Sequence, residues 1–156
     1  MADLSFMRSP VGLVPADAKA AEWFAKVKMG QPVSASVRVP RNGPFHRKFF
    51  AMLDVAYANH DWPEITFRFG SASVKAKTSP DMFRKYVIVK AGHYEADMTP
   101  SGEFRAVPKS IAWAKMDEIE FSQLYSDVLD VILAEFLTNW TTGDMDHAVQ
   151  MMMGFC

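Results

Sequence analysis

The segment from Arg41 to Lys48, RNGPFHRK, places basic side chains where a helix is predicted to begin. Its composition predicts a turn over residues 41–44, and apolar residues then recur at helical spacing over residues 45–57. Each exposed cation at the positive end of a helix destabilises the helix by about 0.3–1 kcal/mol. The unpaired N–H groups of a first helical turn attract anions. We therefore interpret this segment as a candidate phosphate-binding site.

The candidate site extends onto the residues that precede the turn, because no acid occurs between Glu22 and Asp54. Aromatic side chains of the same helix could stack on bases if one of them faces outward. Alternatively, the cations are solvated or paired with the acidic C-terminal helix, and the phenylalanines belong to the core. The predicted nucleic-acid-binding residues are Arg38, Arg41, Asn42, His46, Arg47 and Lys48.

Charge is distributed unevenly along the chain, with a net +6 over residues 1–110 and a net −7 over residues 111–156. A second and more dispersed basic group lies between residues 75 and 90. The acids of the predicted helix 117–140 form either a solvated face or a surface for a basic partner. A protein-interaction module that uses this helix and the methionine-rich tail, acting on a host DNA-processing or defence enzyme, is therefore the alternative function.

The residues offer no recognisable catalytic or metal-binding pattern. The four histidines are far apart, and the chain lacks the HExxH, GxSxG, GxxxxGK[ST] and GxGxxG patterns. Its one cysteine, Cys156, permits no intrachain disulfide. No stretch is apolar for long enough to be a signal peptide or a membrane span. We expect a cytoplasmic protein without catalytic residues, metal or cofactor, and a nuclease or other enzyme with dispersed catalytic residues ranks last among the candidate functions.

The periodicity of the sequence predicts a mixture of helices and strands. Alternation of Val33, Ala35, Val37 and Val39 with polar residues predicts a half-buried strand. Asp117 followed by Glu120 predicts a capping box that opens a long amphipathic helix. The other predicted elements are a strand at 4–8, a turn at 10–15, a helix at 15–30, a strand at 66–69, a helix at 80–90, a hairpin at 93–96 and 103–107, and a helix at 144–153.

With 156 residues, of which 49% are apolar, the chain has the size and composition of one globular domain. We expect an α+β fold in which a small, mostly antiparallel sheet packs against several helices. Residues 1–140 form this domain in our interpretation. Residues 141–156 form a methionine-rich helix or tail, which is either part of the domain or an interaction segment.

The run RNGPFHRKFFAML over residues 41–53, together with residues 109–111 and 115–117, resembles a family of phage and prophage proteins, the domain of unknown function numbered 1367. This resemblance implies a small protein encoded near replication and recombination genes. The same run is also similar to the NinB (Orf) family of lambdoid phage recombination mediators. The pattern is carried by Arg41, Arg47, Lys48, Ala51 and Leu53, and a second patch by Met116, Glu120, Phe121 and Leu124.

The second resemblance implies a homodimer that binds single-stranded DNA and helps to load a recombinase onto strands covered by single-strand-binding protein. It therefore favours a recombination or replication accessory protein in the bacterial host. Single-strand-binding protein or a host recombination enzyme would be its protein partners. Two positions depart from the mediators' pattern, because His46 replaces a polar residue and Phe50 replaces a tryptophan.

Overall fold

The computed structural model describes residues 3–40, 42–112 and 114–154. The chain separates into two compact units, Met1–Val37 and Arg38–Cys156, and each is described here by itself. Within the described ranges, no helix is both long enough and apolar enough to cross a membrane.

The first unit consists of a hairpin and a helix. Strands β1 (Phe6–Ser9) and β2 (Gly12–Pro15) pair antiparallel, and helix α1 (Ala18–Lys26) follows. The Asp17 carboxylate caps α1 by accepting a hydrogen bond from the Ala20 N–H at 2.7 Å. The predicted helix is confirmed. The predicted turn at 10–15 is too long, because the chain reverses at Pro10 and Val11, and Gly12–Pro15 form the second strand.

Residues 31–40 join the units, and the predicted strand within them is wrong. All ten residues are exposed and none belongs to a strand. Within the described chain, the one backbone hydrogen bond of residues 32–40 is that which the Val39 carbonyl accepts from the Glu118 N–H. Alternating side chains favour an extended backbone, but a strand also needs a neighbouring strand, and the described chain provides none here.

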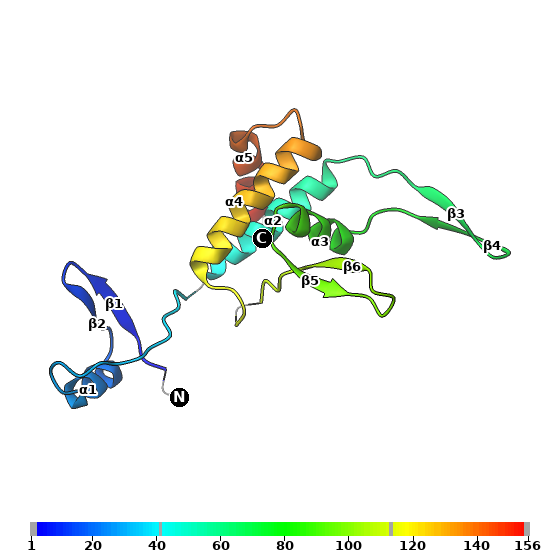
Figure 1. Ribbon diagram of the computed structural model, residues 1–156. Coiled ribbons are helices and arrows are strands. Elements are labelled where there is room, and N and C mark those ends of the chain that lie inside the picture. The colour runs from blue at the N-terminus through cyan, green and yellow to red at the C-terminus, as the bar shows by residue number, and fades with distance from the viewer. Residues whose placement is uncertain (1–2, 41, 113, 155–156) are drawn as a thin grey trace. The chain divides into compact units, whose positions relative to one another are not determined.

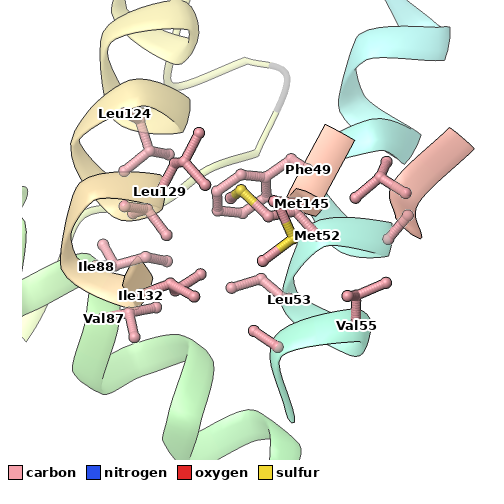
Figure 2. Close-up of a cluster of buried hydrophobic side chains, with 14 of the residues drawn as sticks. Phe49, Met52, Leu53, Val55, Val87, Ile88, Leu124, Leu129, Ile132 and Met145 are labelled. Atoms are coloured by element: carbon pink, nitrogen blue, oxygen red, sulfur yellow. The ribbon is translucent and has the colours of Figure 1, made fainter. Parts of the chain in front are cut away.

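Four helices form the core of the second unit (Figure 1). They are α2 (Gly43–Ala58), α3 (Pro80–Lys90), α4 (Glu118–Glu135) and α5 (Thr142–Gly154). Figure 2 shows Met52 of α2, Val87 of α3, Ile132 of α4 and Met145 of α5 converging on one apolar cluster, and all four are fully buried. Burial of an apolar side chain of this size contributes about 1.5–3 kcal/mol. Helix α5 therefore helps to build the core of this unit.

Local capping groups fix where these helices begin. The side chains of Asn42, Ser79 and Asp117 accept hydrogen bonds from the first turns of α2, α3 and α4. The predicted capping box of Asp117 and Glu120 is confirmed, with both reciprocal bonds present. Helix α4 ends at residue 135, before the predicted residue 140, and a turn leads from there into α5.

Two further hairpins belong to the second unit. Strands β3 (Ile65–Phe69) and β4 (Ala72–Ala76) pair between α2 and α3, whereas β5 (Tyr94–Met98) and β6 (Phe104–Pro108) pair between α3 and α4. The α+β class is confirmed, as are the antiparallel pairing and the hairpin after α3. The strands of the described chain form three separate hairpins instead of one sheet, and β4 was missed.

Candidate nucleic-acid interface

The residues before α2 contact the start of α4. The Arg38 guanidinium donates to the Ala114 carbonyl at 2.9 Å. The Asn42 N–H donates to the Glu118 carboxylate at 2.9 Å, and the Asn42 side chain caps α2. A carboxylate of the chain itself therefore occupies part of the anion-attracting end of α2.

His46 packs between aromatic rings. Its imidazole stacks on Phe121 of α4 at a centroid distance of 5.4 Å and lies 5.1 Å from Phe50. Both His46 and Phe50 are half-buried. Phe45 also contacts Phe121, edge to face. The aromatic side chains at the start of α2 thus serve mainly as packing, as the alternative interpretation proposed.

The two neighbouring cations differ in their surroundings. Arg47 is exposed, and the described chain offers it no acidic partner. The Lys48 ammonium lies 2.9 Å from the Asp146 carboxylate of α5, and this hydrogen bond raises the pKa of Lys48 above its usual value. The same ammonium lies 5.3 Å from the centre of the Tyr125 ring.

Tyr125 is the polar group most deeply enclosed near this pair. Burial raises the pKa of its phenol. Its hydroxyl oxygen is buried and has no hydrogen-bond partner within the described chain, so Lys48 acts on it through its charge. Such a group loses its hydration without compensation, which destabilises the fold. We assign it no function.

The start of α2 is therefore largely occupied by contacts within the chain. Of the predicted residues that the structure describes, Arg38, Asn42, His46 and Lys48 have partners, and Arg47 is the exposed cation without an acidic partner among them. Arg41 lies outside the described residues.

Several acids of α4 also have internal partners. Besides Glu118, the Glu135 carboxylate accepts from the Tyr86 hydroxyl at 3.0 Å and pairs with Lys90 of α3 at 3.3 Å. The acidic face that the alternative function requires is therefore partly engaged within the fold. Asp130 is exposed and has no partner in the described chain.

Asp127 of α4 forms a pair that the sequence did not reveal. Its carboxylate lies 2.7 Å from the His93 imidazole and accepts a hydrogen bond from Gln123. The histidine contact, followed by that of Gln123, lowers the pKa of Asp127 below its usual value. The pair joins the residue before β5 to the middle of α4. The nearest signal in the sequence, Glu95 two residues after His93, pointed to a different carboxylate.

The hairpin of β3 and β4 carries exposed aromatic rings on one face and cations on the opposite face. We call strands β3 and β4 the β3–β4 ribbon; Figure 1 shows them as a two-stranded projection from the helices. Phe67 and Phe69 are 55% and 83% exposed. Arg68 and Lys77 are exposed without an acidic partner in the described chain, while Lys75 pairs with Glu64 at 3.1 Å. Such a surface pair is weak and easily replaced.

A pocket of about 580 Å³ lies at the base of this ribbon. Trp62, Phe83, Tyr86 and Phe136 supply its aromatic wall, and these rings contact one another at centroid distances of 5.1–5.9 Å. The pocket is mostly apolar, with the charges of Lys77 and Glu135 at its lining. A volume of this size accommodates a small planar molecule or a nucleobase.

The pocket and the start of α2 are separated by the length of that helix. Tyr57, in the last turn of α2, stacks on Trp62 of the pocket at 5.0 Å. The 16 residues of α2 span about 24 Å at 1.5 Å per residue. No sequence motif indicates the pocket, because its wall comes from three separate segments. In the sequence, Lys75 and Lys77 are only part of the dispersed basic group between residues 75 and 90.

The fold and these surfaces define a helical core with hairpins that carry exposed basic and aromatic side chains. The chain matches the family described as "Protein of unknown function (DUF1367)" over residues 1–66 and 58–155, and it belongs to this family. The prediction from the run at 41–53 is thereby confirmed. No curated protein and no solved structure matches the chain. The resemblance to the NinB mediators stays a prediction.

Proposed function

We propose that this protein binds single-stranded DNA, as a phage-encoded accessory protein of recombination or replication in the host cytoplasm. The support from the structure is one conjunction of features. The β3–β4 ribbon presents exposed phenylalanines on one face and Arg68 on the other, and Lys77 follows directly after β4. Neither cation has an acidic partner in the described chain, and an aromatic pocket lies at the base of the ribbon. The phage context rests on the resemblances of the sequence.

Stacking on aromatic rings is the first element of the proposal. Phe67, Phe69 and Tyr86 each expose roughly half or more of their surface. Every base has a π face, so stacking recognises single strands without regard to sequence and contributes about 1–3 kcal/mol per base. The bases of a duplex are already stacked and paired. The ribbon and pocket therefore favour single strands.

Phosphate neutralisation is the second element. Arg68 and Lys77 are free to contact phosphates, and Lys75 can exchange its exposed partner Glu64 for one. Each phosphate contact to a single strand makes the slope of log affinity against log salt more negative by about 0.7. A strand held by these three cations therefore binds with a slope of about −2.

The start of α2 is a second, weaker contact region in this proposal. Arg47 is its available cation, and Glu118 opposes the approach of a phosphate there. We therefore assign the main contacts to the ribbon, with residues 38–48 contributing by their charge when a strand continues along α2.

The test is fluorescence anisotropy with labelled single-stranded and duplex oligonucleotides at several salt concentrations. Phe69→Ala is expected to weaken single-strand binding by roughly 5- to 150-fold, the equivalent of one stacked base. Arg68→Gln with Lys77→Gln is expected to reduce the salt slope by about 1.4. These side chains are exposed, so the fold should persist.

Matched controls come from the first unit. Phe24→Ala removes an aromatic ring that is 54% exposed, and Lys26→Gln with Lys28→Gln removes the same charge as the ribbon variant. For both variants the affinity for single strands should stay within about twofold of the wild-type value. A larger loss from Arg47→Ala than from the ribbon variants would return the site to α2.

The absence of binding at low salt would refute the proposal. The alternative function, an adaptor or inhibitor of a host DNA-processing enzyme, would then be tested by capture of a host partner. Single-strand-binding protein and recombination enzymes are the first candidates for such a partner.

A further inference from the structure

Residues 33–39 have the pattern of a strand and lack a partner strand. Their apolar face consists of Val33, Ala35, Val37 and Val39, and its three valines are 43–67% exposed. Their polar face consists of Ser34, Ser36 and Arg38. Prolines at both ends confine this strand-like stretch to seven residues. Except for the Val39 carbonyl, its backbone groups make no hydrogen bond within the described chain.

The β5–β6 hairpin has two faces of the same kind. Tyr94, Ala96 and Met98 of β5 lie on one face with their partners Pro108, Ala106 and Phe104 of β6. Glu95 and Asp97 lie on the opposite face together with Arg105, the partner of Asp97 in β6, so this face carries a net negative charge. Met98 and Phe104 are 72% and 68% exposed. A two-stranded hairpin of this kind is marginally stable alone and gains stability from a third strand.

We infer that residues 33–39 of one chain pair with the outer edge of β5 in a second copy of this chain. Two such contacts related by a two-fold axis close an isologous homodimer. The inference does not depend on DNA binding, because it uses neither the β3–β4 ribbon nor the pocket.

The apolar and polar faces of residues 33–39 and of the hairpins determine which hairpin edge the segment pairs with. Pairing places the valines beside Tyr94 and Met98, and it places Arg38 on the side of Glu95 and Asp97. The β3–β4 ribbon carries Arg68 and Lys75 on its polar face, so Arg38 would meet like charges there. Strand β6 is half-buried over residues 106–108 and packs beside α3, whereas every residue of β5 is exposed.

A second copy is the partner because the chain supplies both halves of the contact. Within one chain, the hydrogen bonds from Arg38 to Ala114 and from Glu118 to Val39 hold the end of the segment at the start of α4. The backbone hydrogen bonds of the described chain pair neither residues 33–38 nor the outer edge of β5 with another strand. Association of two chains satisfies both without breaking these bonds.

The test combines sedimentation velocity with hydrogen exchange on the full chain over a range of concentrations. We expect a concentration-dependent dimer, and we expect amides in 33–39 and 94–98 to become protected as it forms. A monomer at all concentrations would overturn the inference. So would a dimer in which 33–39 stays unprotected, or protection without a change of mass, which would mean pairing within one chain.

Two lysine substitutions on opposite faces sharpen the test. Val37→Lys puts a charge on the apolar face and is expected to raise the dissociation constant at least tenfold, because burial of the valine is lost. Ser36→Lys puts the same charge opposite the acids of β5 and should leave the dimer intact or tighten it. Both residues are exposed in the single chain, so each variant should fold. Equal effects of the two would contradict the proposed pairing.

Discussion

Glu118 is predicted to stabilise the start of two helices at once. It occupies the first turn of α4, and its carboxylate accepts a hydrogen bond from Asn42, the cap of α2, at 2.9 Å. Glu118→Gln removes the charge while it preserves the size of the side chain. The variant therefore isolates the electrostatic contribution.

The magnitude follows from the two interactions. A hydrogen bond to a charged group contributes about 1.5–3 kcal/mol, and the amide oxygen of glutamine retains part of it. The favourable field at each helix start contributes about 0.3–1 kcal/mol. We expect a loss of about 1–2 kcal/mol. At a urea dependence of about 2 kcal/mol per molar, the unfolding midpoint falls by about 0.5–1 M.

The measurement is urea unfolding followed by circular dichroism, with Asp130→Asn as the control. Asp130 lies on the same helix, is exposed and has no partner in the described chain, so its replacement should change stability by less than about 0.5 kcal/mol. Equal midpoints for the two variants would refute the role of Glu118.

The same variant also reports on DNA binding. Removal of Glu118 leaves the start of α2 more positive and its Asn42 N–H more available to a phosphate. If the β3–β4 ribbon carries the main contacts, affinity for single strands rises by less than about threefold, as expected for one distant charge. A much larger rise would place the main phosphate contact at α2.

Three further predictions concern stability. Asp127→Asn should lower the free energy of unfolding at pH 7. Because His93 lowers the pKa of Asp127, the difference in stability between wild type and variant is present above the ordinary pKa of 3.8 and disappears as the pH falls through the folded pKa. Urea unfolding at pH 7 and pH 3 measures this difference. Phe49→Ala, at a fully buried site, should cost about 3–5 kcal/mol by the same assay, and a loss below 1 kcal/mol would contradict its place in the core. Lys48→Gln should lower the free energy of unfolding by less than about 1 kcal/mol, because the ion pair of Lys48 with Asp146 is partly exposed. Since the pKa of Lys48 is raised, the stabilisation by this pair is present below pH 10.5 and is lost as the pH rises above it. The urea midpoints of variant and wild type should therefore converge in strong alkali.

The helices of the second unit and the family could be predicted from the residues alone. The signals at Ser79 and at Asp117 with Glu120 act over three residues, so they operate before any tertiary contact forms. The run at 41–53 likewise carried the family membership. Local hydrogen bonding and side-chain periodicity are properties of neighbouring residues, and a sequence displays them directly.

Which charges and rings are available to a partner depends on contacts between segments that lie far apart in the sequence. Lys48 meets Asp146 across 98 residues, and Asn42 meets Glu118 across 76. The aromatic wall at the base of the β3–β4 ribbon joins side chains from three segments. Residues 33–39 show why a local pattern is not enough. Their alternation of apolar and polar residues favours a strand, but whether a neighbouring strand is present depends on the fold. Pairing between distant segments depends on how the helices pack, which the spacing of residues along the chain does not specify.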